Sequence, residues 1–439
     1  MKINRNAIIQ YFLIYLMLVF NGANLYINFS KQHSSLYWLL LIAIVGVGLF
    51  SYVYKPKKYK NMYCCIILAI VFASIVVVRY TAGGVGVKVF IEYAAHVFLT
   101  FLAVSVNKEK FAQRLINSVY VLAIISLICY VIQLVKPEIL KMFLKRYNSI
   151  FGQRIWDSSS KYTVYYQPAW GQLFFSMREG EMRRNLGMFS EPANYQIVLN
   201  AALYLLLFCQ KYYSFSKKEY MRRIIIIIIA ILTCQSTTGY ICMFILMAAY
   251  LLSNKEILQS RHVKKTIFRF FALGTLVLIL DYIFRGADSF LGTAIVEKII
   301  GSDNTLDFSV STGVFRIGTI TASLGIMLTK PLGVGFDRAF AIIESHLQGA
   351  AGGALMLFGG ALGVIPFVSV IIWSIKPVLK TKYISLYAKI AYVIFFMYTG
   401  LAQSKVFYPC VIMIPLLILF YNPQRTRFSM HNKQYHLER

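Results

Sequence analysis

The chain has 439 residues, of which 58% are apolar and only 14% charged, and its formal net charge is +28 at pH 7. Soluble domains have about a quarter charged residues, so this composition excludes an ordinary soluble protein. The basic residues fall between apolar runs, where membrane topology uses them, so the net charge does not indicate a nucleic-acid partner. The seven cysteines lie in apolar runs, which gives neither a disulfide framework nor a zinc-ligand spacing.

Repeated apolar runs approach the roughly 20 residues that cross a bilayer, and they predict an all-α, polytopic membrane helix bundle. The first run has a basic start and lacks a small-residue cleavage site, so we expect a retained span rather than a cleaved signal. We expect one integral membrane domain over 1–439 with about twelve transmembrane helices, at 7–27, 36–54, 62–79, 86–106, 116–135, 194–212, 222–235, 239–253, 267–284, 350–373, 384–402 and 406–421.

Positive charge predicts the orientation of these spans. With the N-terminus in the cytoplasm, the inside segments hold most of the lysines and arginines, whereas the short outside loops hold only Lys31, Arg79 and Lys405. Both termini, including the tail 422–439, are therefore expected in the cytoplasm. The same charge pattern favours a hairpin of two short helices over 222–253, with its tip at Gln235–Gly239.

Two outside segments, about 136–193 and 285–349, are longer than a connection requires, and loops of this length are commonly functional. Helical spacing of apolar residues predicts an amphipathic helix over 138–151 that lies on the outer leaflet. The second segment is expected to hold a helix over 314–328, followed by a turn at 331–335. The next apolar run favours close approach of a neighbouring helix, because glycine recurs at four-residue spacing at Gly349, Gly353, Gly359 and Gly363.

The stretch 183–194 places two arginines, a glutamate and a proline directly before an apolar run. A guanidinium matches phosphate oxygens two at a time, so Arg183 and Arg184 are candidates for anion capture. Pro192 fits the first turn of a helix, and Glu191 suits the electropositive end of that helix. The alternative is an interfacial anchor, because arginine at a membrane edge also contacts lipid headgroups.

Further candidates lie in the second long segment and in the fourth span. Arg316 opens the helix predicted there at its electropositive end, where an anion would also meet free backbone N–H groups. His346 can accept or donate a proton near neutral pH, or it is an inert loop residue. Lys88, Glu92 and His96 are spaced four apart on one helix face, which fits mutual pairing as well as a substrate or proton path.

Taken in order, these stretches resemble the O-antigen polymerase and O-antigen ligase superfamily, which includes the Wzy-type capsular polysaccharide polymerases. Residues 184–192 are similar to its Arg-x-x-Gly-x-Phe-x-Glu-Pro segment, and residues 236–239 to its Ser-x-x-Gly hairpin tip. Arg316 and residues 331–335 resemble its second arginine and its Pro-x-Gly-x-Gly turn. Ser345-His346 resembles its closing His-Asn segment, although Leu347 stands where that family has asparagine.

The resemblance implies a GT-C-like, lipid-dependent glycosyltransferase at the outer face of the bacterial cytoplasmic membrane. It would polymerise undecaprenyl-diphosphate-linked oligosaccharide repeat units into O-antigen, capsule or exopolysaccharide, with no cofactor. No Asp-x-Asp occurs, so the metal-diphosphate clamp of nucleotide-sugar transferases is missing and a metal-independent reaction is expected. The implied catalytic residues are Arg184, Arg316 and His346, and the substrate-binding candidates are Arg183, Glu191, Ser236 and Arg338.

Two other functions stay open at this point. A ligase, which moves the lipid-linked glycan to another acceptor, would use the same arginines and histidine. A flippase or transporter fits the number of spans, but secondary transporters usually have related halves and a site near the midplane. The candidate partners are the lipid bilayer, a chain-length regulator and a flippase.

Overall fold

The structure is a computed structural model, and it describes residues 5–54, 62–82, 87–151, 154–160, 163–171, 173–178, 183–254, 276, 279–280, 283–284, 286, 312–347, 353–402 and 407–420. This part of the chain is mostly helical and contains sixteen α-helices and one short 3-10 helix. Within the described residues, four helices have stretches long and apolar enough to cross a membrane, at Ser34–Ser51, Cys64–Thr81, Lys88–Val106 and Lys108–Val135.

The elements follow one another along the chain with these bounds. The first ten helices and the 3-10 helix are α1 (Arg5–Phe20), α2 (Asn24–Gln32), α3 (Ser34–Tyr54), α4 (Met62–Thr81), α5 (Val87–Val106), α6 (Lys108–Val135), α7 (Pro137–Phe151), α8 (Pro192–Phe208), η2 (Gln210–Tyr212), α9 (Lys217–Thr233) and α10 (Thr237–Ser253). The later helices are α14 (Thr312–Thr329), α15 (Phe336–Leu347), α16 (Ala354–Leu362), α17 (Val364–Lys380), α18 (Leu386–Ala402) and α19 (Pro409–Phe420). The strands are β1 (Arg154–Ser160), β2 (Thr163–Trp170) and β3 (Met177–Arg178).

Helices occupy nearly all of the predicted spans. The hairpin predicted over 222–253 is confirmed, because α9 and α10 are separated by a break at 234–236. The amphipathic helix predicted over 138–151 is confirmed as α7, and the helix predicted over 314–328 as α14. The span predicted over 267–284 lies almost wholly outside the described residues, and twelve membrane crossings remain a prediction.

Two predicted spans are wrong as single helices, and in both a glycine with a positive φ interrupts the run. The span 7–27 divides at Gly22, whose φ of 97° starts the turn from α1 into α2. The span 350–373 divides at Gly363, with φ 95°, between α16 and α17. Only glycine enters this backbone region without a steric penalty, so both breaks are built into the sequence.

An all-α chain was expected, but the first long outside segment also contains a small sheet. The strands follow the order β1-β2-β3, and both pairs are antiparallel. Phe175, which lies between β2 and β3, and Met177 of β3 pack with Leu140 and Leu144 of α7 in a small core of their own. This second core fixes α7 to the end of the protein rather than leaving it as a free amphipathic helix.

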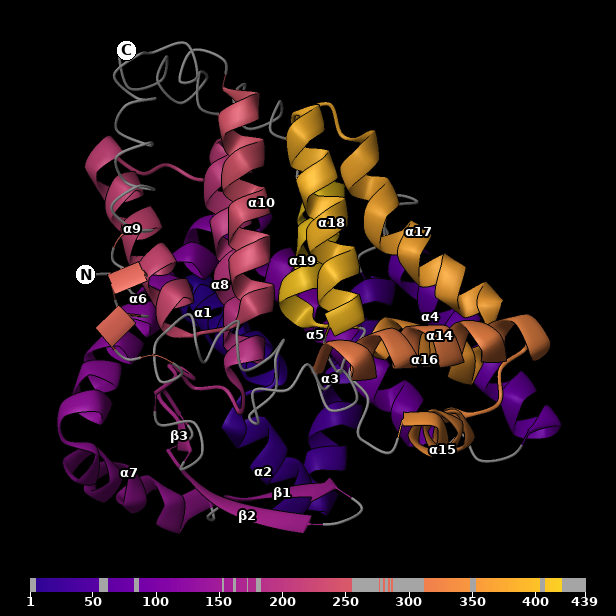
Figure 1. The fold of residues 1–439 in the computed structure, drawn as a ribbon. Helices are drawn as coiled ribbons and strands as arrows, with labels where there is room; N and C mark the ends of the chain where they lie inside the picture. The colour runs from indigo at the N-terminus through magenta and orange to yellow at the C-terminus, as the bar shows by residue number, and fades with distance from the viewer. Residues whose placement is uncertain are drawn as a thin grey trace, which may run out of the picture.

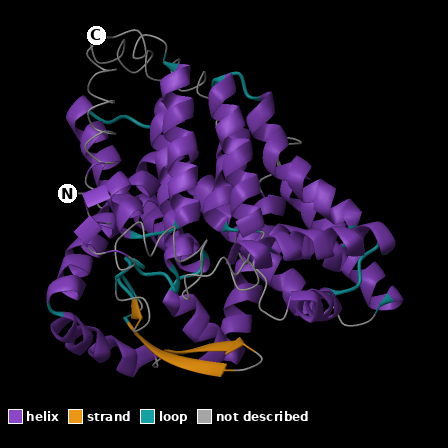
Figure 2. Ribbon diagram, viewed as in Figure 1, coloured by secondary structure: helices purple, strands orange, loops and turns teal. Residues whose placement is uncertain are grey.

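Helices run between two ends of the molecule (Figure 1). In that view, the start of α9, the end of α10 and the turn between α17 and α18 lie toward the top, so these three ends are on the same side of the molecule. Helices α2, α7 and α15 lie toward the bottom, and the sheet lies there with them, as Figure 2 shows in orange.

Helix α8 lies at the centre of the molecule. Nearly all of its residues are buried, on every face, and a helix that is apolar all round belongs inside a bundle. It packs between elements from both halves of the chain, among them α6, α9, α10 and α19. One continuous hydrophobic core, running from Ile14 to Leu417, surrounds it.

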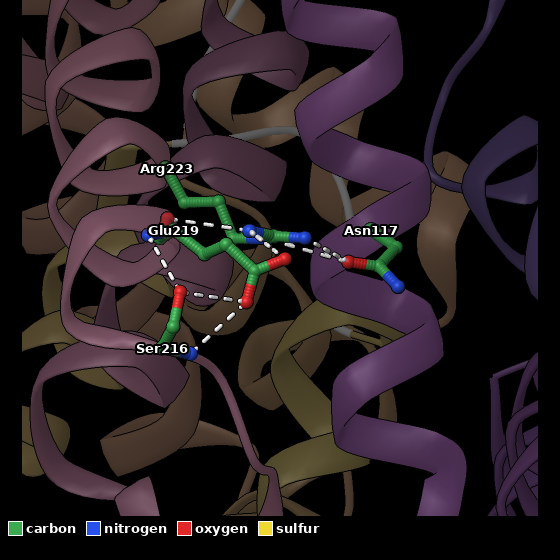
Figure 3. A network of polar contacts seen from close by, with 4 residues as sticks. All are labelled: Asn117, Ser216, Glu219 and Arg223. Atoms are coloured by element: carbon green, nitrogen blue, oxygen red, sulfur yellow. Dashed lines mark hydrogen bonds and ion pairs between the residues drawn. The ribbon is translucent and has the colours of Figure 1, made fainter.

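The start of α9 is fixed by the network of polar contacts drawn in Figure 3. Arg223 is 7% exposed, and its guanidinium donates to Oδ1 of Asn117 on α6 at 2.9 Å and lies 4.0 Å from the ring centroid of Phe215. Ser216 and Glu219 form a capping box at the first turn of α9. These contacts fix the N-terminal end of α9, which is the first helix of the hairpin.

Candidate functional site

Two parallel helices, α8 and α10, begin at the same end of the bundle. Gln196 in the second turn of α8 lies against Gly239 in the first turn of α10, and the rings of Phe208 and Tyr250 meet at the other ends, 6.2 Å apart. A Cβ at position 239 would lie 2.9 Å from Cβ of Gln196, so only glycine allows this approach. The electropositive ends of both helix dipoles therefore lie side by side.

The arginine segment 183–190 docks onto the hairpin tip between α9 and α10. The guanidinium of Arg184 donates from Nε to the carbonyl oxygen of Cys234 at 3.3 Å and from Nη2 to that of Gln235 at 3.0 Å. The next residue, Asn185, donates its backbone N–H to the carbonyl oxygen of Thr233 at 2.9 Å. Arg184 thus satisfies carbonyls at the C-terminal end of α9, where a cation is also favoured by the helix dipole.

A compact turn at Gly187 shapes the middle of the segment. Gly187 has a φ of 54°, and a Cβ there would lie 2.9 Å from the ring of Tyr195. That ring is fully buried, stacks on Phe189 at a centroid distance of 5.4 Å, and its hydroxyl lies 2.7 Å from the Ser126 hydroxyl. The Gly-x-Phe pattern therefore has a packing reason in this chain.

The other edge of the segment pairs with the break between α1 and α2. Ala23 and Phe189 form an isolated antiparallel bridge. On either side of it, the Asn24 N–H donates to the carbonyl oxygen of Met188 and the Ser190 N–H to that of Gly22, both at 3.1 Å. Buried backbone groups need such partners, so the break at Gly22 and the arginine segment depend on each other.

A third stretch of chain, at the start of α19, completes the junction. Tyr408 donates its hydroxyl to Oδ1 of Asn194 at 2.8 Å, and the Cys410 N–H donates to Oδ1 of Asn21 at 3.2 Å. The C-terminal third of the chain therefore contacts both the break between α1 and α2 and the first turn of α8.

The structure brings together four of the predicted site residues. Arg183 is exposed and Arg184 is half-buried at the hairpin tip. Glu191 is the N-cap residue of α8, with Pro192 directly after it as predicted. Ser236 is the N-cap residue of α10 and is 5% exposed. Two cations and two helix N-termini therefore share one end of the bundle, which is an arrangement that favours a bound anion.

The remaining three predicted residues lie on α14 and α15, and the side chains of Arg316 and His346 are outside the described part. Helix α14 begins at Thr312, so the prediction that Arg316 opens the helix is wrong by one turn. Its own N–H lies far enough into the helix to be used within it. His346 is in the last turn of α15 rather than in a loop, and Arg338 is exposed in the first turn.

The turn before α15 is locked against the break between α16 and α17. Gly333 has a φ of 89°, and a Cβ on it would lie 2.4 Å from the carbonyl oxygen of Ala361. The Gly335 N–H donates to that same oxygen at 2.9 Å, and the Val364 N–H donates to the carbonyl oxygen of Pro331 at 2.9 Å. The predicted turn at 331–335 is confirmed, and it sets where α15 starts.

No family model matches the chain, and no curated protein matches it. The resemblance to the O-antigen polymerase and ligase superfamily therefore rests on the sequence motifs alone. Within the described residues, no group of three or more His, Cys, Asp or Glu side chains is placed to hold a metal ion.

The face of α5 singled out in the sequence contacts the N-terminal helices. Lys88 lies over the ring of Trp38, 5.8 Å from its centroid, and the hydroxyl of Tyr26 donates to Glu92. The His96 ring is buried edge-on to the ring of Phe20, at a centroid distance of 5.7 Å. All three side chains therefore have contacts on α1, α2 or α3.

Sequence reasoning missed the polar residues that hold the arginine segment in place. Asn21, Asn24, Ser126, Asn185 and Asn194 are buried at the junction and make hydrogen bonds that cross between elements. One signal was present, because Asn21-Gly22 inside an apolar run is a turn dipeptide. The others carry no periodic pattern and become meaningful only through their partners.

Proposed function

We propose that the protein is a metal-independent glycosyltransferase that polymerises undecaprenyl-diphosphate-linked repeat units at the outer face of the bacterial cytoplasmic membrane. One observation carries the proposal: Arg183 and Arg184 lie where the N-termini of α8 and α10 meet. Such a site suits a diphosphate, because guanidinium groups and helix N-termini both favour negative charge. The order of the four motifs along the chain supports the same substrate class.

In the proposed reaction, a hydroxyl of the acceptor sugar attacks the anomeric carbon of the donor. The bond between that carbon and the lipid diphosphate oxygen breaks, and the diphosphate leaves with additional negative charge. Fixed arginines can stabilise this charge without reorganising. We assign that role to Arg184 and Arg316. We assign to His346 the removal of the proton from the acceptor hydroxyl.

Arg184 also has a structural role, because it caps the C-terminal end of α9 through two carbonyl oxygens. A guanidinium has five N–H donors, and this anchoring by itself uses two of them. The two bonds to the hairpin tip would fix the plane of the guanidinium before the substrate binds. Donors that are already oriented stabilise a transition state without reorganising.

The decisive experiment uses purified protein in liposomes with a synthetic undecaprenyl-diphosphate-linked repeat unit, EDTA, and neither ATP nor an ion gradient. We expect the lipid-linked glycan to lengthen, which mass spectrometry of the products detects. Transfer to an added lipid A core instead of lengthening would indicate a ligase. Movement of the lipid across the bilayer without any new glycosidic bond would indicate a flippase and sink the proposal.

Replacing Arg184 with lysine separates the effect of its positive charge from the effect of its planar guanidinium group. Lysine keeps a cation at the end of α9 but cannot make the planar, two-point contact, so we expect the rate of lengthening to fall about 10²-fold. The matched control is Arg222→Ala, which removes an exposed arginine at the opposite end of α9 and should leave the rate unchanged. A wild-type rate for Arg184→Lys would remove this residue from the site.

A further inference from the structure

Glu92 is a carboxylate in the second turn of α5, a helix long and apolar enough to cross a membrane. Such residues are costly in a membrane and usually have a function. Its Oε1 accepts a hydrogen bond from the hydroxyl of Tyr26 on α2 at 2.5 Å. The Tyr26 hydroxyl also lies 2.8 Å from that of Tyr37 on α3, so three helices meet at one phenol.

The same helix, α2, forms one wall of the junction that holds the arginine segment. Its first residue, Asn24, donates its backbone N–H to the carbonyl oxygen of Met188 at 3.1 Å. The Asn24 side chain donates to the Ser176 hydroxyl at 2.8 Å, which ties α2 to the stretch between β2 and β3. Helix α2 has only nine residues, so a displacement at Tyr26 is carried directly to Asn24, half a turn away.

A helix this short is not stable alone, because helices below about 12 residues depend on their packing. The capping at its start does not compensate, since Ala23 makes no side-chain cap hydrogen bond. The bond from Tyr26 to Glu92 ties this short helix to α5.

We propose that Glu92 is a positioning residue that acts through Tyr26 and α2 to fix the bridge between Ala23 and Phe189. It thereby holds Arg184 in place for its work on the diphosphate. The catalytic part of this inference rests on the proposed function, whereas the mechanical link from Glu92 to the bridge does not. Two separate measurements therefore test it.

The first measurement is backbone hydrogen exchange in detergent micelles, followed by mass spectrometry of peptides that contain Asn24 or Ser190. These two residues donate the N–H groups on either side of the bridge. Glu92→Ala and Tyr26→Phe should each speed exchange of both peptides about tenfold, because the hydrogen bond between α2 and α5 is lost. Glu92→Gln keeps an acceptor for the phenol and should stay close to the wild-type rate.

Lys88→Ala is the matched control, because Lys88 lies on the same face of α5, one turn away, and contacts Trp38 instead of α2. It should leave exchange and activity unchanged. If Tyr26→Phe and Glu92→Ala are folded but exchange like the wild type at both peptides, the link does not exist. An equal effect of Glu92→Gln and Glu92→Ala would also overturn it, since the acceptor would then not matter.

The second measurement is glycan lengthening in liposomes. Glu92→Ala should lower kcat about tenfold with little change in KM, because the misplaced arginine acts mainly in the transition state. Glu92→Gln should restore most of the rate. An unchanged kcat with faster exchange would overturn the catalytic part of the inference. A wild-type protein that never lengthens glycan, with the exchange result as expected, would support the link and overturn the transferase itself.

Discussion

Arg184 and Gln235 are 51 positions apart in the chain and are joined by a 3.0 Å hydrogen bond from Nη2 of the arginine to the carbonyl oxygen of the glutamine. The bond crosses from the segment before α8 to the tip of the α9–α10 hairpin. Gln235 is the non-glycine residue with a positive φ, 48°, in the described part of the chain. Arg184 therefore binds the backbone of a residue that has an uncommon conformation.

Replacing Gln235 with glycine tests whether this conformation is strained. The left-handed region costs an L-residue about 1–2 kcal/mol, so Gln235→Gly should keep or raise the thermal unfolding midpoint despite glycine's greater flexibility. Activity should persist, because Arg184 bonds to the backbone and not to the side chain. Gln235→Val should lower the midpoint instead. A clear drop in the midpoint for the glycine variant would contradict this account.

Gly187→Ala should destabilise the arginine segment. The new Cβ would lie 2.9 Å from the buried ring of Tyr195, at a φ of 54°. Strain of this kind and overpacking each cost about 1–3 kcal/mol. Thermal unfolding in detergent measures the loss.

The matched control for that substitution is Gly325→Ala. Gly325 lies within α14, and a Cβ there meets nothing within 4 Å. Alanine is the better helix former by about 0.5–1 kcal/mol, so this variant should be as stable as the wild type or more so. If the two alanine variants behaved alike, the geometry at Gly187 would not be the cause.

Gly333→Ala should displace α15 and reduce activity while the rest of the bundle stays folded. Its Cβ would lie 2.4 Å from the Ala361 carbonyl oxygen and 2.7 Å from the Gly363 nitrogen, and backbone atoms cannot move aside as a flexible side chain can. Limited proteolysis, with peptide mapping of 331–347, should show earlier cleavage in this region. Gly46→Ala, where a Cβ meets nothing within 4 Å, should match the wild type in the same assay.

The capping box of α9 predicts a dependence of stability on acid pH. The backbone N–H and the hydroxyl of Ser216 donate to Oε2 of Glu219 at 2.9 and 3.1 Å, and these bonds lower the pKa of the Glu219 carboxyl. A lowered folded pKa means that the contribution is complete above the ordinary value of about 4.3. It is lost as the pH falls through the lowered pKa.

Ser216→Ala should therefore reduce stability by about 1 kcal/mol, the usual cost of an N-cap. It should also flatten the acid side of the stability curve, because the box is already gone. Urea unfolding in micelles at a series of pH values between about 3 and 7 measures both effects around the ordinary pKa. If the free energy of unfolding of Ser216→Ala falls with acid pH as steeply as that of the wild type, the capping box is not the source of this pH dependence.

The positions of most helices followed from hydropathy and charge. The hairpin between α9 and α10 was predicted because basic residues lie on both sides of a run too long for one comfortable crossing. The turn at 331–335 was predicted from its proline and glycines. These features are local, so a single stretch of sequence contains the physical cause.

The breaks at Gly22 and Gly363 were missed because apolar residues continue on both sides of each glycine. A glycine within such a run is tolerated or breaks it depending on what packs nearby. Here Asn194 and the backbone at 331–332 occupy the space that a side chain would need. The sheet was missed for a related reason, since its strands lie in a segment read only for its helix and charges.

What the sequence determined by itself was the class of protein, the run of helices and the segments that carry arginine. The tertiary structure decided what those arginines do, because Arg184 docks on a hairpin tip and Ser190 bonds to Gly22 across 168 positions. Hydropathy reports how much apolar surface each stretch buries, which is a property of neighbours along the chain. Hydrogen bonds between buried polar groups depend on which distant partners meet, and only the folded chain fixes that.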